Sequence, residues 1–229
     1  MITKRPANER GAAGHGWLQS RHSFSFANYY DPQHMGVSAL RVINDDKVMK
    51  GAGFGMHSHQ DMEIISYITK GAIEHKDSMG NTELLTAGEF QLMSAGHGIT
   101  HSEYNASDTE PLEFLQIWIQ PDEYGIEPGY QQKRFDTQQG LQLIASPDSK
   151  DGSFKIHQNA SLYRLVMDKD TQLTQRITPG RTVYLHVIHG KIMHDGVSME
   201  AGDGATISAM TEIDIRCLKN CEALLFDLP

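Results

Sequence analysis

The sequence predicts an all-β protein composed of two antiparallel β-barrels with few short helices. Three observations lead to this fold class. Segments rich in β-branched and aromatic residues are separated by turn residues at intervals of roughly eight to twelve residues, as in barrels and sandwiches. No long segment has the apolar periodicity of an amphipathic helix. A strand–glycine–hairpin pattern occurs once in each half of the chain, which indicates a duplicated domain.

The expected strands of the first half each end at a turn signal. Lys70-Gly71 closes one strand, residues 77–81 form a hairpin turn, and Pro121 stops the last strand because proline has no N–H to donate to a sheet. The expected strands cover residues 38–44, 63–69, 72–76, 82–85, 89–93 and 113–120.

The internal repeat sets the expected domain organisation. Residues 66–71 are followed by a turn and by the Ala-Gly-acid sequence of residues 86–89. Residues 185–190 are followed in the same way by residues 200–203. The segment from 121 to 152 is rich in Pro, Gly, Gln and Asp, which is typical of an inter-domain connection. We therefore expect an N-terminal domain over residues 1–125 and a C-terminal domain over residues 126–229.

Composition restricts the class of protein. The chain has 29 acidic and 20 basic residues and a formal net charge of −9, which disfavours direct binding to nucleic acid or to an anionic membrane. No apolar signal segment or bilayer-length apolar run is present, and Cys217 and Cys221 match no common zinc or redox motif. We expect a cytoplasmic protein in which these cysteines have no special role.

Two short motifs predict a metal site. His57-Ser58-His59 and His101-Ser102-Glu103 each place two donor side chains two residues apart, so each pair points to one face of a strand. Two such strands inside a barrel present three imidazoles and one carboxylate to a single ion. This donor set suits Fe, Mn, Ni, Cu or Zn rather than Ca or Mg, and it leaves positions open for substrate or dioxygen.

The remaining histidines are weaker candidates. His75 and His97 flank the two motifs, and His97 is equally consistent with contacting a bound ligand or with a simple turn position. His186, His189 and His194 are three and five residues apart, and these spacings do not share one strand face. We therefore expect them to be surface or packing residues.

Aligning the two copies of the repeat tests the second domain for the same ligands. With Gly71 placed on Gly190 and Gly88 on Gly202, none of the four candidate ligands is retained. The equivalent residues are Arg176, Thr178, Ile215 and Cys217. The sequence therefore predicts two barrels and one metal, with no metal ligands in the C-terminal domain.

Long motifs of the chain resemble the pirin family of the cupin superfamily, most closely its bacterial members assigned as quercetin 2,3-dioxygenases. The similar segments are residues 22–32, 40–46, 57–63, 77–80 and 93–103. The resemblance implies a bicupin of two jelly-roll-like barrels, with metal ligands at His57, His59, His101 and Glu103. It implies Fe(II) as the ion, with Zn, Mn, Ni, Co or Cu as alternatives. Residues 60–62 depart from many relatives, and the second half matches less closely.

The resemblance also implies a reaction, the cleavage of a flavonol with O2 and release of carbon monoxide. Glu103 is then the candidate base, because a carboxylate ligand is released and protonated more readily than an imidazole. Asp61, Glu63 and Gln116 are candidates to hydrogen-bond the ligand imidazoles, with ordinary strand polarity as the alternative. Phe54, Met56 and Met93 either form an apolar wall for a flat ring or pack in the core.

Two other functions remain open at this point. One is a metal-dependent regulator that binds transcription or metabolic enzymes, which would need no substrate pocket and for which the acidic charge suits a protein partner. The other is oxidation of a different enolisable molecule. A cavity beside the metal site large enough for a three-ring flavonol favours the enzyme.

Overall fold

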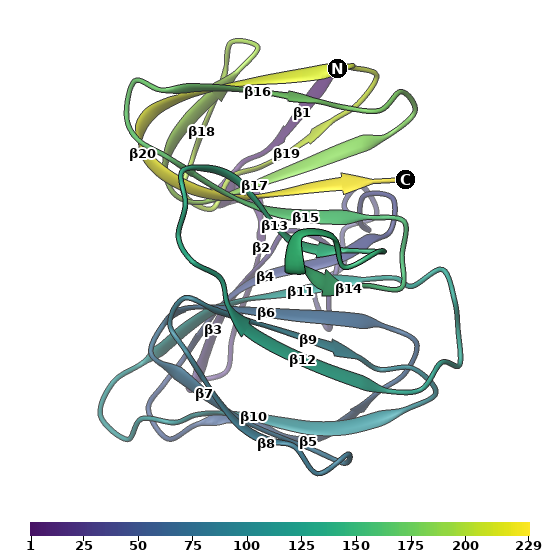
Figure 1. Ribbon diagram of the computed structural model, residues 1–229. Helices are drawn as coiled ribbons and strands as arrows, with labels where there is room; N and C mark the ends of the chain where they lie inside the picture. The colour runs from purple at the N-terminus through teal and green to yellow at the C-terminus, as the bar shows by residue number, and fades with distance from the viewer. The chain divides into compact units, whose positions relative to one another are not determined.

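The regular structure of the chain is almost entirely β-strand (Figure 1). The computed structural model describes all 229 residues, which form two compact units. The N-terminal unit contains residues 11–36 and 40–135, and the C-terminal unit contains residues 1–10, 37–39 and 136–229. The predicted all-β fold class is confirmed, and the helical content is limited to the 3-10 turns η1 (Ala7–Glu9) and η2 (Lys150–Gly152). None of the helical segments has the length and hydropathy needed to span a bilayer.

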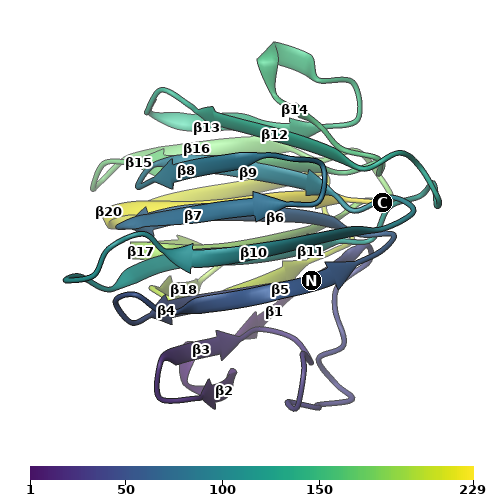
Figure 2. The same cartoon turned by 90° about the horizontal axis from the view of Figure 1, so that it is seen from below.

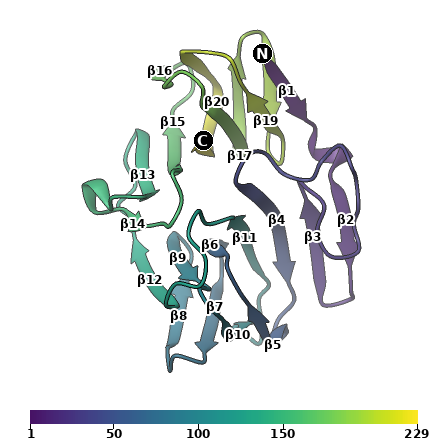
Figure 3. The ribbon, with the colours of Figure 1, turned by 90° about the vertical axis from the view of Figure 1, so that its right-hand side faces the viewer.

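The N-terminal unit consists of two antiparallel sheets that lie opposite each other (Figures 1 and 3). The larger sheet has seven strands, in the order β12 (Gly129–Arg134), β9 (Glu89–Ser94), β6 (Glu63–Lys70), β11 (Leu112–Ile119), β4 (Leu40–Val48), β3 (Leu18–His22) and β2 (Gly11–Gly14). The smaller sheet, which faces the viewer in Figure 2, has the order β5 (Gly53–His59), β10 (Ile99–Asn105), β7 (Ala72–Asp77) and β8 (Thr82–Thr86).

The C-terminal unit is a single nine-stranded sheet built around two long strands. These strands are β17 (Thr182–His194) and β20 (Glu212–Leu228), and bulges interrupt their pairing. The main path also contains β1 (Ile2–Arg5), β19 (Gly204–Ile207), β15 (Ser161–Met167), β13 (Gly140–Ser146) and β14 (Phe154–Lys155). Two further strands pair off this path, β16 (Gln172–Arg176) with β20 and β18 (Val197–Glu200) with β17.

The units differ from the expected ranges 1–125 and 126–229 at both ends. Strand β1 pairs with β19, so the first ten residues belong to the C-terminal unit (Figure 3). Strand β12 pairs with β9, which extends the N-terminal unit to Phe135. Both pairings join segments that are far apart in the sequence, and the local sequence of a strand does not indicate which strand it pairs with.

The repeated glycines and acids have the same conformation in both units. Gly71 and Gly190 have φ angles of 82° and 85°, a left-handed region that favours glycine. In each Ala-Gly-acid turn the acidic side chain accepts a hydrogen bond from the backbone N–H three residues earlier. The bond from Thr86 N to Glu89 measures 2.6 Å and that from Glu200 N to Asp203 measures 2.8 Å. These shared turns support the duplication inferred from the sequence.

Candidate metal centre

The smaller sheet of the N-terminal unit brings three histidines together. Strands β5 and β10 are antiparallel, and His57 lies directly opposite His101. The ring centroids are 4.7 Å apart for His57 and His59, 4.4 Å for His57 and His101, and 5.0 Å for His59 and His101. One nitrogen from each ring lies within 4.8 Å of the others. The two-residue spacing on β5 therefore produces the convergence that the same-face argument predicts.

The imidazoles of His59 and His101 are neutral near neutral pH. Burial, followed by the nearby His57, lowers the pKa of His59 to about 4. Burial, followed by the charges of His57 and His59, lowers the pKa of His101 to about 2. His57 Nδ1 lies 2.7 Å from the carbonyl oxygen of Gly55, to which it donates, so Nε2 is the ring nitrogen that remains for a ligand.

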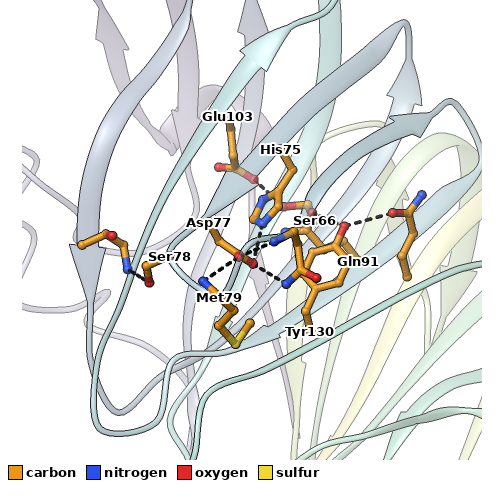
Figure 4. Close-up of polar contacts among 11 residues, drawn as sticks. Ser66, His75, Asp77, Ser78, Met79, Gln91, Glu103 and Tyr130 are labelled. Carbon is orange, nitrogen blue, oxygen red and sulfur yellow. Dashed lines mark hydrogen bonds and ion pairs between the residues drawn. The ribbon is translucent and has the colours of Figure 1, made fainter.

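Glu103 is the fourth predicted ligand, and it groups with His101 but not with His57 and His59. Its side chain is 2% exposed, and one carboxylate oxygen accepts a 3.2 Å hydrogen bond from Ser66 (Figure 4). The carboxylate forms a group with His75 and His101 whose candidate ligand atoms are all within 4.8 Å of one another. Burial raises the pKa of Glu103 to about 7, the hydrogen bond from Ser66 opposes this rise, and the charge of Asp46 adds to it.

His75 is a neighbour of this site that the sequence reasoning left without a role. It is buried opposite Glu103 in the β7–β10 pairing, and its Nε2 lies 3.2 Å from Asp77 Oδ2 (Figure 4). Burial lowers the pKa of His75, although the hydrogen bond and charge of Asp77 oppose this effect. The expected strand ended at residue 76, but β7 extends to Asp77, so the two-residue spacing of His75 and Asp77 places both side chains on one strand face.

The buried polar atoms of the site fit a bound cation. Neither ring nitrogen of His101 and only one carboxylate oxygen of Glu103 has a hydrogen-bond partner. Unpaired buried atoms are unfavourable unless a ligand satisfies them. Three imidazoles and a carboxylate match a single divalent transition metal, because such ions accept nitrogen and oxygen donors together.

A cavity of about 370 Å³ opens beside His57 and His59. Phe54 forms part of its wall and Gln116 lines it as well, whereas Met93 is buried in a separate apolar cluster and Met56 is 62% exposed. The other lining residues are Ala13, His15, Trp17, Leu18, Ser20, His22, Phe26, Ala27, Asn44, Asp46 and Trp118. His59 also lines a second, more open cavity of about 470 Å³ together with Gln60 and Ser78. His59 thus borders both cavities, whereas His57 borders only the first.

Three polar residues that the sequence placed near the site have other partners. Asp61 accepts a 2.7 Å hydrogen bond from the backbone N–H of Gly125. Glu63 is buried and accepts a 2.9 Å hydrogen bond from Ser94. His97 is half-exposed in the loop before β10, with its Nε2 3.2 Å from a carboxylate oxygen of Glu127.

In the C-terminal unit, His186 and His194 are buried and His189 is largely exposed. His194 Nδ1 lies 2.9 Å from the carbonyl oxygen of Asp214, to which it donates. Cys217 and Cys221 are buried thiols with 3.6 Å between their sulfur atoms, and burial, followed by the hydrogen bond with Cys217, raises the pKa of Cys221 to about 12.

Comparison with known families gives matches in both halves of the chain. The Pirin family model matches residues 3–119, and the model of the quercetinase C-terminal cupin domain matches residues 143–228. The chain is 56% identical over 229 residues to quercetin 2,3-dioxygenase of Escherichia coli (strain K12), covering 100% of this chain and 99% of that protein. It is 39% identical over 231 residues to a pirin-like protein of Caulobacter vibrioides, covering 99% of each.

Solved structures give the same result. The bacterial pirin YhhW from Escherichia coli, determined in complex with nickel(II), matches with a TM-score of 0.98 and 55% identity over 100% of this chain and 99% of that one. A quercetin 2,3-dioxygenase from Acinetobacter baumannii shares the fold, with a TM-score of 0.80 at 19% identity, over 98% of this chain and 85% of that one.

Proposed function

The chain belongs to the pirin family, and we propose that it is a metal-dependent dioxygenase that cleaves flavonols such as quercetin with O2 and releases carbon monoxide. The observation that carries this proposal is the cavity beside the histidine cluster. Its walls include Trp17, Phe26, Phe54 and Trp118, and its volume of about 370 Å³ is in the range of small-molecule sites. A flat aromatic substrate packs against such rings while it reaches His57 and His59.

The proposed ligands of the ion are His57, His59, His101 and Glu103. We propose Fe(II) as the native ion, with Ni, Mn, Co, Cu or Zn as the alternatives. A bound divalent ion supplies Lewis acidity that lowers the pKa of a substrate hydroxyl, and it provides a centre at which dioxygen reacts. The protein holds the substrate ring in the cavity and excludes bulk water from the reacting atoms.

Glu103 is the proposed general base. It is buried next to His101, and one of its carboxylate oxygens is held by Ser66 while the other has no hydrogen-bond partner. When that oxygen is released from the ion it would accept the proton of the flavonol 3-hydroxyl, and Ser66 keeps the carboxylate oriented during the transfer.

The test is anaerobic reconstitution of the metal-free protein with each ion, followed by exposure to oxygen with quercetin. We expect oxygen uptake with equimolar carbon monoxide release for Fe(II) or for one of the alternative ions. An absence of oxygen uptake with every ion and several flavonols would contradict the enzyme and leave a metal-dependent regulator as the better explanation.

A further inference from the structure

One wall of the cavity carries polar side chains from the larger sheet. Ser20 and His22 on β3, and Asn44 and Asp46 on β4, are alternate residues that line the cavity. The strand register places Ser20 opposite Asp46 and His22 opposite Asn44, and Asn44 is in turn opposite Gln116 on β11. His57 and His59 come from the smaller sheet, so the polar wall and the histidines are on different walls of one cavity.

Two oxygen atoms of this wall lack hydrogen-bond partners. The side chains of Asn44 and Ser20 are 1% and 4% exposed, and neither Asn44 Oδ1 nor Ser20 Oγ is hydrogen-bonded. Trp17, Leu18 and Phe26 line the same cavity and offer these oxygens no side-chain acceptor or hydroxyl donor, so a hydroxyl group of a bound ligand would supply the missing partner.

The chemistry of the wall selects the type of ligand group. Asp46 is among the lining residues and no lysine or arginine is, so a carboxylate or phosphate would find no matching charge. An amide turns over to present either its oxygen or its N–H, and a serine hydroxyl both donates and accepts. A neutral phenolic hydroxyl, which also donates and accepts, is the complementary group.

We propose that Asn44 and Ser20 recognise a ring hydroxyl of the substrate, so that the protein prefers polyhydroxylated flavonols to flavonols with the 3-hydroxyl alone. This inference rests on the proposed function for the identity of the ring system. It assigns substrate selection to side chains of β3 and β4, away from the residues proposed to bind the metal.

The test is an anaerobic binding titration of zinc-loaded protein, in which the absorbance of the flavonol reports binding. Quercetin and 3-hydroxyflavone are the two probes, since both carry the 3-hydroxyl and only quercetin carries further hydroxyls. We expect native protein to bind quercetin at least about tenfold more tightly, because the unpaired oxygens are satisfied only by quercetin. Asn44→Leu and Ser20→Ala are each expected to reduce this preference several-fold while the affinity for 3-hydroxyflavone stays within about twofold.

Ser23→Ala is the matched control, because Ser23 is a buried serine on the same segment that does not line the cavity. It should leave both affinities unchanged. Equal binding of the two probes by native protein, or an unchanged preference in both variants, would overturn the proposal. Tighter binding of quercetin than of 3-hydroxyflavone would support this inference even if no reconstituted metal gave oxygen uptake. That second result would overturn the proposed reaction, so failure of the inference and failure of the proposed function are distinguishable.

Discussion

His101 combines nearly complete burial with two unpaired ring nitrogens. Because its ring is neutral, its N–H has no acceptor in the metal-free protein, and an unsatisfied buried group of this kind costs about 1–3 kcal/mol. We expect His101→Leu to abolish metal binding and to raise the free energy of unfolding of the metal-free protein by about 1 kcal/mol. Urea denaturation of chelator-treated protein and metal analysis measure the two effects.

His75→Leu is the comparison for this prediction. His75 contacts the buried carboxylate of Asp77, so leucine would leave that carboxylate without one of its partners. We expect this variant to lower the free energy of unfolding. If His101→Leu lowered the free energy of unfolding as much as His75→Leu does, the ring of His101 would already have a hydrogen-bond partner in the metal-free protein.

Glu103→Gln separates metal binding from proton transfer. Glutamine keeps an oxygen that accepts from Ser66 and binds a metal, but it removes the charge and the basicity. We expect metal to stay bound while quercetin cleavage falls by about a hundredfold or more. Oxygen consumption and metal content are measured on one preparation. Glu74→Gln, a change on the adjacent strand β7, should retain the native rate, and native turnover in Glu103→Gln would exclude the base role.

The sequence predicted some residues of the site better than others, for a physical reason. The two motifs place their donors two residues apart, so a local pattern was sufficient to propose them as ligands. Ser20, Asn44 and His75 belong to the cavity or the cluster through strand register, which depends on pairing between distant segments. Nothing in the local sequence around these three residues indicates which strand lies opposite.

At the scale of the strands, Asp203 joins three segments of the C-terminal unit. Its carboxylate is 2.7 Å from Lys4 Nζ on β1 and accepts 2.8 Å hydrogen bonds from the backbone N–H groups of Ala7 and Glu200. Burial raises the pKa of Asp203, but the bonds from Lys4, Glu200 and Ala7 together lower it below the ordinary value.

This lowered pKa has a definite consequence for stability. The folded protein favours the charged carboxylate, so the contribution is present above the unfolded pKa of about 3.9 and is lost as the pH falls through the folded value. We expect Asp203→Asn to lower the free energy of unfolding by about 1–2 kcal/mol at pH 7 and to have a smaller effect near pH 3. Urea denaturation at both pH values tests this, and an equal loss at both would show that charge is not involved.

The strand predictions succeeded where strands are apolar and continuous. Residues 63–69 and 113–120 were expected as strands and correspond to β6 (Glu63–Lys70) and β11 (Leu112–Ile119). Strand β12 (Gly129–Arg134) lies inside the expected connection because its sequence, GYQQKR, is polar. Its place is set by pairing with β9, so tertiary contacts override its weak local preference.

At the scale of the whole molecule, we predict one metal ion per chain, because the candidate ligands lie in the N-terminal unit. The Arg, Thr, Ile and Cys residues that occupy the equivalent positions of the second copy do not form the N-terminal donor set. We expect metal analysis to give one ion per chain in the native protein and in a variant with His189 and His194 both replaced by Asn. His57→Ala and His59→Ala should each lose the ion. Half the native content in the double Asn variant would reveal a second site.

The pairing of β1 with β19 also determines when the C-terminal unit is completed during protein synthesis. Ile2 is translated about 200 residues before its partner Ile207. During that interval the first strand has no sheet to join, while residues 11–36 and 40–135 are already available to fold. Strand β1 is therefore among the last strands to form its native hydrogen bonds, although it is translated long before β19. A bulky fusion at the N-terminus would disturb the unit that is synthesised last.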